Sequence, residues 1–492
     1  METLIGIWGT VLPNFLTLLF VADFFIAFTI IFLERKNPSA TLAWIMILFL
    51  LPVAGIVFYF IFSQNISRQK MFRLSKSEEA GLKNALAKQI EEIKSGDFVF
   101  SNRESRRWKD MIRLNQIYAK AYFTQDNKIS VITDGEDMHC RLIQDIKEAK
   151  TSINIMYFII KNDSIGKQVL QTLTDRARNG VEVRLLIDAI GGRQILDHTV
   201  ADLRSAGGKV SFFFPPKFKY LKFVNLKLNY RNHRKLVIID GAIGYIGGFN
   251  IGREYVGLKK KFGFWRDTHL RILGSGVQDI NARFIMDWKF ASKEDLIVSQ
   301  AFYSEVLREG TTGIQIVSSG PDSSREEIKR GYMKMVTSAT KNVYLQTPYF
   351  VPDDSLLDSL KMAAMSGVDV RVMIPCMPDH MFVYWATYAY VGELINSGAR
   401  IYVYNNGFLH AKTLVVDGEV ASIGSANFDR RSFRLNFEAN AFIYDGVEAK
   451  KIEAIFEKDM TLCHELTKEL YQKRSLVIKF KESISRLLSD LL

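Results

Sequence analysis

The chain has 492 residues, enough for two or three domains, and it carries a formal net charge of +12 with a pI near 9.3. Apolar residues make up 48% and aromatic residues 12% of the chain, which excludes a largely disordered protein. The three cysteines are far apart and form no Cys-x-x-Cys pair, so neither a disulfide framework nor a cysteine zinc site is expected. The excess of Lys and Arg favours an anionic partner, either nucleic acid or an anionic lipid surface.

Two long apolar runs open the chain. They span residues 11–33 and 42–62, and the second run contains no charged residue. Each is close to the ~20 residues that a helix needs to cross a bilayer, so residues 1–65 are predicted to form a two-helix transmembrane hairpin. A cleaved signal peptide would need a basic start, whereas the only charge before the first run is Glu2. The other alternative is a buried soluble hairpin, but a soluble core helix normally has a polar face.

The charges that flank these runs predict an orientation. The loop between the runs carries Arg35 and Lys36, whereas residues 66–76 after the second run carry four cations. The more positive flank stays inside, so we expect a multi-pass protein of the cell membrane with its large domain on the cytoplasmic side. Asp23, within the first run, is either a functional intramembrane acid or a polar residue that faces the partner helix.

A charged segment and then an internal repeat follow. Residues 66–120 are predicted to be a charged connecting arm, with helical spacing over Ser75–Gly96. Beyond this arm, three strand-like segments of a first copy recur in a second, so that 152–158, 180–187 and 208–213 correspond to 342–348, 367–374 and 399–404.

In each copy, short strands rich in Val, Ile and Tyr alternate with helical stretches, such as Lys167–Asn179 and Ser355–Ser366. This pattern predicts an α/β fold with a buried, mixed or parallel sheet. The two similar lobes, residues 121–300 and 301–492, would share one active-site cleft.

Each copy also contains the motif His-x-Lys-x4-Asp, followed by Gly-x-x-Asn. The first copy supplies His233, Lys235, Asp240 and Asn250, and the second supplies His410, Lys412, Asp417 and Asn427. On an extended strand, a His and a Lys two positions later point to the same face. The four apolar residues that follow carry the strand through the core to an Asp-Gly turn. If the lobes pair, two histidines, two lysines and two asparagines would converge on one phosphate.

These paired motifs resemble those of the phospholipase D superfamily over about residues 120–470. The apolar hairpin and the stretches Thr347–Pro352 and Asn427–Glu438 resemble the bacterial cardiolipin synthases within it. Gly248 departs from the superfamily pattern, which usually has Ser there, and this removes a possible hydroxyl contact to phosphate. The resemblance implies that Asp267 and Glu438, at matching places in the two copies, lie in the substrate site and pair with the histidines.

The chemistry of a phosphodiester assigns roles to these residues. One histidine attacks phosphorus to form a phosphohistidine, and the other protonates the departing alcohol. Lys235 and Lys412 hold the phosphate oxygens by charge, and the asparagines add hydrogen bonds. By resemblance, His233 is the expected nucleophile and the other histidine the acid. With these cations in place, no metal or other cofactor is expected.

The resemblance implies that the protein makes cardiolipin. One phosphatidylglycerol would donate its phosphatidyl group, and a second would accept it, so the expected partners are phosphatidylglycerol and anionic membrane lipids rather than nucleic acid. A hydrolytic phospholipase D, which passes the group to water, is the alternative. The two apolar runs argue against a nuclease, and the two complete motifs argue against a non-catalytic lipid-binding scaffold.

The first copy is about 14 residues longer just before its catalytic strand. In this insertion, Phe212–Tyr230, aromatic and aliphatic residues alternate with Lys and no acid is present. Such a stretch can bury its rings at the lipid boundary while its lysines contact anionic headgroups, so it is predicted to rest on the bilayer. A hydrophobic loop packed between the lobes is the alternative.

Overall fold

The computed structural model describes residues 17–18, 21–29, 38–51, 53–56, 59, 71–72, 75–215, 229–297, 306–487 and 489. The chain divides into two compact units. The first comprises Met1–Ile66 and Pro216–Tyr230, and the second comprises Ser67–Pro215 and Arg231–Leu492. Most of the insertion before the first catalytic strand lies outside the described residues, so its placement on the bilayer stays a prediction.

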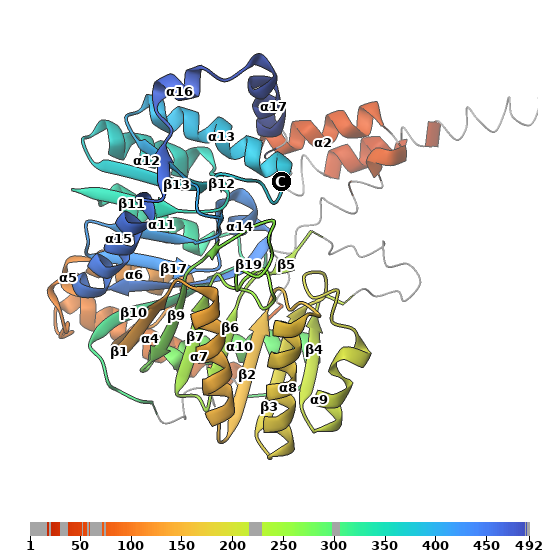
Figure 1. The fold of residues 1–492 in the computed structure, drawn as a ribbon, viewed down its shortest axis with the longest axis vertical. Coiled ribbons are helices and arrows are strands. Elements are labelled where there is room, and N and C mark those ends of the chain that lie inside the picture. The colour runs from red at the N-terminus through yellow and green to blue at the C-terminus, as the bar shows by residue number, and fades with distance from the viewer. Residues whose placement is uncertain are drawn as a thin grey trace, which may run out of the picture. The chain divides into compact units, whose positions relative to one another are not determined.

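The first unit contains helical stretches at residues 21–29 and 53–56 and the helix α2 (Pro38–Leu50), drawn in red in Figure 1. Trp44, Leu48 and Tyr59 form a small apolar cluster against which Ile26 packs, so these stretches lie against one another. Helix α2 ends before a bend at Leu51. Of the helices in the described ranges, none is both long enough and apolar enough to cross a bilayer. The transmembrane hairpin therefore stays a prediction.

The second unit is built on one mixed sheet that runs through both lobes. The strands of the first lobe are β1 (Phe123–Ile132), β2 (Ser152–Tyr157), β3 (Glu182–Asp188), β4 (Lys209–Phe213), β5 (Arg231–Asn232), β6 (Leu236–Ile239), β7 (Ile243–Gly247), β8 (Trp265–Arg266) and β9 (His269–Leu273). Those of the second lobe are β10 (Thr312–Ser319), β11 (Asn342–Gln346), β12 (Phe350–Val351), β13 (Asp369–Pro375), β14 (Arg400–Tyr404), β15 (Phe408–Leu409), β16 (Thr413–Val416), β17 (Val420–Gly424), β18 (Phe428–Asp429), β19 (Asn436–Tyr444) and β20 (Cys463–Glu465).

The strand order confirms the internal repeat. The first lobe follows the order β4-β3-β2-β6-β7-β9-β1, and the second follows β14-β13-β11-β16-β17-β19-β10, with β20 added at the edge. The lobes join at the centre of the sheet, where β1 and β10 pair antiparallel with Phe123 opposite Gln315. The predicted α/β fold with two similar lobes and a mixed sheet is thus confirmed.

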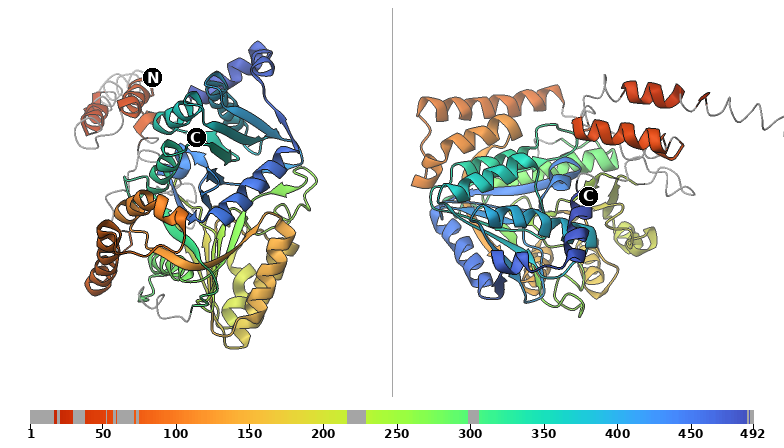
Figure 2. Two further views of the ribbon diagram at one scale, coloured as in Figure 1. Left: turned by 90° about the vertical axis from the view of Figure 1, so that its left-hand side faces the viewer. Right: turned by 90° about the horizontal axis from the view of Figure 1, so that it is seen from above.

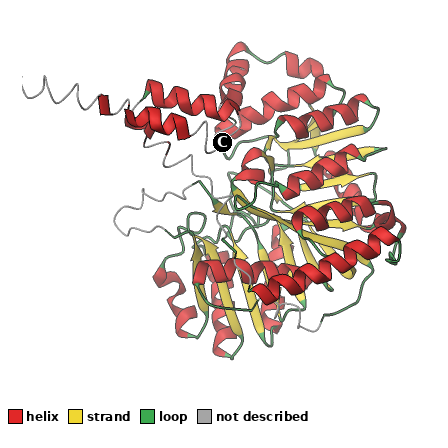
Figure 3. Cartoon of the chain, turned by 180° about the vertical axis from the view of Figure 1, so that it is seen from behind, coloured by secondary structure: helices red, strands yellow, loops and turns green. Residues whose placement is uncertain are grey.

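Helices cover both faces of this sheet (Figures 1 and 3). In the first lobe, α7 (Gly135–Glu148), α8 (Ser164–Arg178) and α9 (Ala201–Ser205) share an apolar core with Ile153 and Ile155 of β2. Asn154 points to the opposite face, as alternation along a strand requires, and its side chain donates a hydrogen bond to Asn281 of α10 (Gly276–Ser292) at 2.9 Å. The helices of the second lobe are α11 (Glu327–Thr337), α12 (Asp354–Met365), α13 (Met381–Asn396), α14 (Arg430–Arg434), α15 (Gly446–Met460), α16 (Lys468–Gln472) and α17 (Leu476–Leu487).

From residue 75 onward, the segment predicted as a connecting arm is packed into the second lobe. It forms α4 (Lys76–Ser95), α5 (Arg103–Arg107) and α6 (Lys109–Ala119), the first of which has a Ser75 capping box and ends at Gly96 with a φ of 91°. Trp108, Met111 and Ile112 belong to the core of the second lobe. Figure 2 shows these helices, in orange, against that lobe. The helical spacing is therefore confirmed, and the three helices are part of the folded second unit.

Candidate active site

The backbone of each motif histidine is held by the opposite lobe. Strand β5 leads into His233 and pairs in parallel with the start of β19, and the His233 amide donates to the Phe437 carbonyl at 2.9 Å. Strand β15 leads into His410 and pairs in parallel with β8, and the His410 amide donates to the Arg266 carbonyl at 2.7 Å. Both histidines therefore lie at the junction of the two lobes, where they are almost fully buried.

The carboxylates that contact the histidines are also exchanged between the lobes. Nδ1 of His233 lies 3.0 Å from both carboxylate oxygens of Glu438, in the second lobe. Nδ1 of His410 lies 2.5 Å from Oδ2 of Asp267, in the first lobe. A carboxylate at Nδ1 orients each ring and leaves Nε2 to face a substrate. We call these two contacts the crossed pairs. The resemblance implied the pairing, and the structure adds that each pair joins the two lobes.

The two motif lysines are buried beside their own histidines. Lys235 donates to the His233 carbonyl at 2.7 Å, while Lys412 donates to the His410 carbonyl and lies 2.8 Å from its Nδ1. Burial, together with repulsion from the Lys412 charge, lowers the pKa of Lys235 to about 7, although the Glu438 carboxylate opposes the shift. Burial likewise lowers the pKa of Lys412 to about 8. A phosphate bound between them would relieve this repulsion.

Burial also determines the charge of the histidines. It lowers the pKa of His233 to about 4, although Glu438 opposes the shift. It lowers the pKa of His410 too, with a further contribution from the Lys412 charge. Burial alone would raise the pKa of Asp267 and Glu438, but the neighbouring cationic groups bring both pKa values below the ordinary range. Burial thus favours the neutral form of both rings in the free protein, and for His233 this is the form that a nucleophilic imidazole requires.

The two carboxylates are supported differently. The Ser425 hydroxyl donates to Oε2 of Glu438 at 2.5 Å. At the matching position of the first lobe, a Cβ on Gly248 would lie 2.0 Å from Oδ1 of Asp267, so any other residue there would have to displace this carboxylate. Oδ1 of Asp267 instead accepts a hydrogen bond from the Thr268 amide at 2.7 Å. The close approach of Asp267 is thus the steric reason for a glycine at position 248, where the superfamily usually has serine. Ser425, the serine at the matching position of the second lobe, contacts the Glu438 carboxylate.

The motif aspartates bond to backbone amides at the far end of the motif strands, and their grouping with the catalytic residues stays a prediction. Strand β6 lies between His233 and Asp240, and β16 lies between His410 and Asp417. An extended chain of this length spans about 20 Å between the histidine and the aspartate of each motif. The Asp240 carboxylate accepts hydrogen bonds from the amides of residues 150–152 at 2.7–2.9 Å. The Asp417 carboxylate accepts from the amides of residues 340–342 at 2.7–3.1 Å. Both fix the start of the neighbouring strand, β2 or β11, and thereby the position of the catalytic strand.

The two motif asparagines are buried in the loops that follow β7 and β17. Oδ1 of Asn250 accepts a hydrogen bond from the Ile159 backbone amide at 3.1 Å, and the backbone N–H of Asn427 donates to the Ser432 hydroxyl at 3.2 Å. Within the described ranges, neither side chain is hydrogen bonded to a motif histidine, and no three His, Cys, Asp or Glu side chains gather to hold a metal ion.

Several neighbours of the site were not predicted. The Phe158 ring meets the His233 ring edge to face at 4.8 Å between centroids, and the Trp265 ring lies 5.1 Å from that of His410. Asp379 accepts a hydrogen bond from the Tyr349 hydroxyl, and both line a small cavity in the second lobe. The only sequence signal was position: Phe158 ends a repeated strand segment, and Trp265 lies two residues before Asp267.

Comparison with known proteins agrees with this geometry. Residues 142–288 and 332–460 match the family model described as "cardiolipin synthase, PLD-like domain", and residues 21–64 match a phospholipase D-nuclease N-terminal model. The major cardiolipin synthase of Bacillus subtilis is 48% identical, over 97% of this chain and 98% of its own length. A cardiolipin synthase of Listeria monocytogenes is 49% identical, over 98% of this chain and 99% of its own.

A solved structure shows the same fold at low identity. The phosphatidylserine synthase of Haemophilus influenzae superposes with a TM-score of 0.57 at 13% identity, covering 78% of this chain and 97% of that one. At this identity the likeness concerns the fold alone.

Proposed function

The chain belongs to the cardiolipin synthase family of phospholipase D-like proteins, and we propose that it joins two phosphatidylglycerol molecules into cardiolipin and glycerol through a phosphohistidine on His233. It is a phosphatidyltransferase of the phospholipase D type. The observation that supports the mechanism best is the crossed pairs, because two buried imidazoles, each oriented by a carboxylate, provide a nucleophile and a proton carrier in one site.

In the first half-reaction, Nε2 of His233 attacks the phosphorus of one phosphatidylglycerol. The bond from phosphorus to the headgroup glycerol oxygen breaks, and His410 supplies the proton that this oxygen takes as glycerol leaves. Lys235 and Lys412 neutralise the non-bridging oxygens. The bound phosphate adds negative charge beside Lys412, which favours the protonated form of His410 that this step requires.

In the second half-reaction, a free glycerol hydroxyl of another phosphatidylglycerol gives its proton to His410. The resulting oxygen attacks phosphorus, and the bond between phosphorus and the His233 nitrogen breaks to release cardiolipin. One phosphodiester is exchanged for another, so no external energy source is needed. Water in place of the lipid hydroxyl would give phosphatidic acid, an outcome that the family does not favour.

The first unit supports a location in the cell membrane. Met46, Phe49 and Leu50 of α2 are exposed apolar side chains, as expected of a helix in contact with lipid. The first unit would anchor the protein in the cell membrane, and the cations of residues 66–76 would keep the second unit on the cytoplasmic side. The net charge of +12 suits an anionic substrate at that surface.

The products separate transfer from hydrolysis. The full-length protein in vesicles that contain phosphatidylglycerol should release one glycerol for each cardiolipin formed, measured by lipid mass spectrometry and a glycerol assay. The His139→Ala variant, altered at a half-buried histidine of α7 that lies outside the motifs, is a matched control that should keep this ratio. Phosphatidic acid and glycerol in equal amounts, without cardiolipin, would contradict the proposal.

A further inference from the structure

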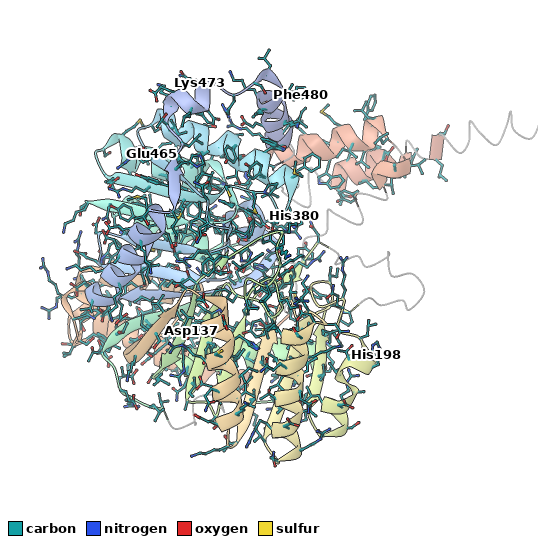
Figure 4. All side chains as sticks on the ribbon, viewed as in Figure 1. Asp137, His198, His380, Glu465, Lys473 and Phe480 are labelled. Carbon is teal, nitrogen blue, oxygen red and sulfur yellow. The ribbon has the colours of Figure 1, made fainter. Side chains whose placement is uncertain are left out.

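Helix α17, near the C-terminus, presents its apolar side chains to solvent. Leu476, Val477, Phe480 and Leu487 are 83%, 63%, 67% and 79% exposed. Their spacing places them along one side of the helix. The helix spans Leu476–Leu487, and Figure 4 labels its residue Phe480.

The polar side of α17 is the side that faces the protein. Glu482 and Ser485 are buried, and Glu482 forms an ion pair with Arg474. The Ser489 hydroxyl lies 3.0 Å from the hydroxyl of Tyr390 on α13, and Arg486 forms an ion pair with Glu393 of the same helix. This is the reverse of the usual arrangement, in which an amphipathic helix buries its apolar face. Specific polar contacts hold the helix in this orientation.

The exposed apolar surface continues onto the first turn of α13. Met381 and Phe382 are both more than half exposed, and Trp385, one turn further on, lies 5.4 Å below the Lys481 ammonium of α17. Asp379 precedes this turn and lines the small cavity of the second lobe with Tyr349. Figure 4 labels His380, beside Asp379, and Phe480 on the same side of the unit. We call α17 and the first turn of α13 the apolar ledge.

The charges along α17 are almost all positive. Between residues 473 and 487 the only acid is Glu482, which is buried in its ion pair. Lys473, Lys479 and Lys481 are exposed. An apolar stripe flanked by lysines is the pattern of a helix that lies in the headgroup region of an anionic bilayer, where its apolar side chains reach the acyl boundary and its ammonium groups meet phosphates.

We propose that the apolar ledge docks on the surface of an anionic bilayer and holds the second unit there, with the active site beside the lipid it consumes. The choice of lipid rests on the proposed function, whereas the docking itself can be measured without turnover. The surface lies in the second lobe, far in sequence from the N-terminal apolar runs, and provides a second membrane contact.

Depth-dependent quenching tests the docking directly. In a full-length protein with Cys140, Cys376 and Cys463 replaced by Ala, a fluorophore would be attached to Phe480→Cys. The matched control is Val447→Cys, because Val447 is an apolar residue of α15 that is 66% exposed. Nitroxide-labelled lipids in phosphatidylglycerol vesicles should quench the probe at 480 at least about threefold more than the probe at 447. Equal quenching at both positions would overturn the proposal. If, in the absence of lipid, the probe at 480 became less accessible to solvent as the protein concentration rose, the proposal would also be overturned, because a second copy of the chain would then cover the ledge.

Turnover supplies an independent test. The double variant Leu476→Glu, Phe480→Glu should lower turnover of phosphatidylglycerol in vesicles by about tenfold, because carboxylates oppose an anionic surface. Turnover of a short-chain phosphatidylglycerol that is monomeric in solution should change less than about twofold, and Val447→Glu should change neither rate. An equal loss on both substrates would contradict docking. If the unaltered protein made no cardiolipin from either lipid, the proposed function would fail, while the quenching result would still decide the docking.

Discussion

The two lobes contain the same motif but support it with different side chains. In the second lobe, Glu438 is held by the Ser425 hydroxyl and by the Asn436 amide, at 3.2 Å. In the first lobe, the shorter Asp267 lies directly against Gly248 and is held by a backbone amide. Each carboxylate serves the histidine of the other lobe. Neither lobe therefore contains a complete histidine–carboxylate pair, and the duplication produces one site rather than two.

The surroundings of the two rings differ in a way that fits their proposed roles. Nδ1 of His233 contacts Glu438 and the Ser425 carbonyl, both acceptors, which increase the basicity of the ring. Nδ1 of His410 contacts Asp267 and also the Lys412 ammonium. A cation beside the ring makes its conjugate acid stronger, which suits the group that gives a proton to glycerol.

The largest expected effect comes from removing either histidine. His233→Ala and His410→Ala should each lower cardiolipin formation by at least about a thousandfold, because nucleophile and proton carrier act as a unit. Radiolabelled phosphatidylglycerol in vesicles would provide the measurement, and circular dichroism would check the fold. Substantial activity in either variant would mean that each lobe works alone.

Exchanging the supports of the two carboxylates should have a smaller and unequal effect. Gly248→Ser should lower kcat by about a hundredfold, because its Cβ would displace Asp267 from His410. Ser425→Gly removes one hydrogen bond to Glu438 and should lower kcat by about tenfold. Equal losses in the two variants would show that the lobes are supported alike.

The pH dependence should reflect the buried lysines. Their pKa values, lowered to about 7 for Lys235 and about 8 for Lys412, mean that the cationic forms are lost as pH rises through this range. The value of kcat/KM reports the free enzyme, so it should fall by up to about tenfold per pH unit between pH 7 and 8, where one ammonium group is lost, and by up to about a hundredfold per unit above pH 8, where both are lost. A profile that stays flat to pH 9 or beyond would contradict the shared burial of the two ammonium groups.

The smallest effect on chemistry is expected at the motif aspartates. Asp240→Ala and Asp417→Ala each remove several hydrogen bonds to backbone amides, so Tm should fall by a few degrees. Below the transition, kcat should stay within about fivefold of the unaltered protein, because neither carboxylate reaches the histidines. Loss of turnover without a change in Tm would show instead that the two aspartates take part in catalysis.

Much of this could be predicted from the sequence, and the exceptions have physical causes. The repeat, the mixed sheet and the helices at 167–179 and 355–366 follow from local periodicity. The crossing of the pairs does not, because it depends on the two-residue strands β5 and β15, which are too short to show any periodicity. The polar sequence of residues 66–120 concealed the buried contacts of Trp108 and Met111. The aspartates were grouped with the catalytic residues because they share a motif with His233 and His410, and the motif does not show that strands β6 and β16 lie between the two groups.

The central claim is that one site is assembled from crossed halves, and trapping the intermediate tests it most directly. After rapid mixing with phosphatidylglycerol and an alkaline quench, mass spectrometry of peptides should find the phosphatidyl group on His233, whose carboxylate partner lies in the other lobe. Glu438→Gln, a change in the second lobe, should lower the amount of this first-lobe adduct by about a hundredfold. An adduct on His410, or an undiminished His233 adduct in Glu438→Gln, would contradict the account.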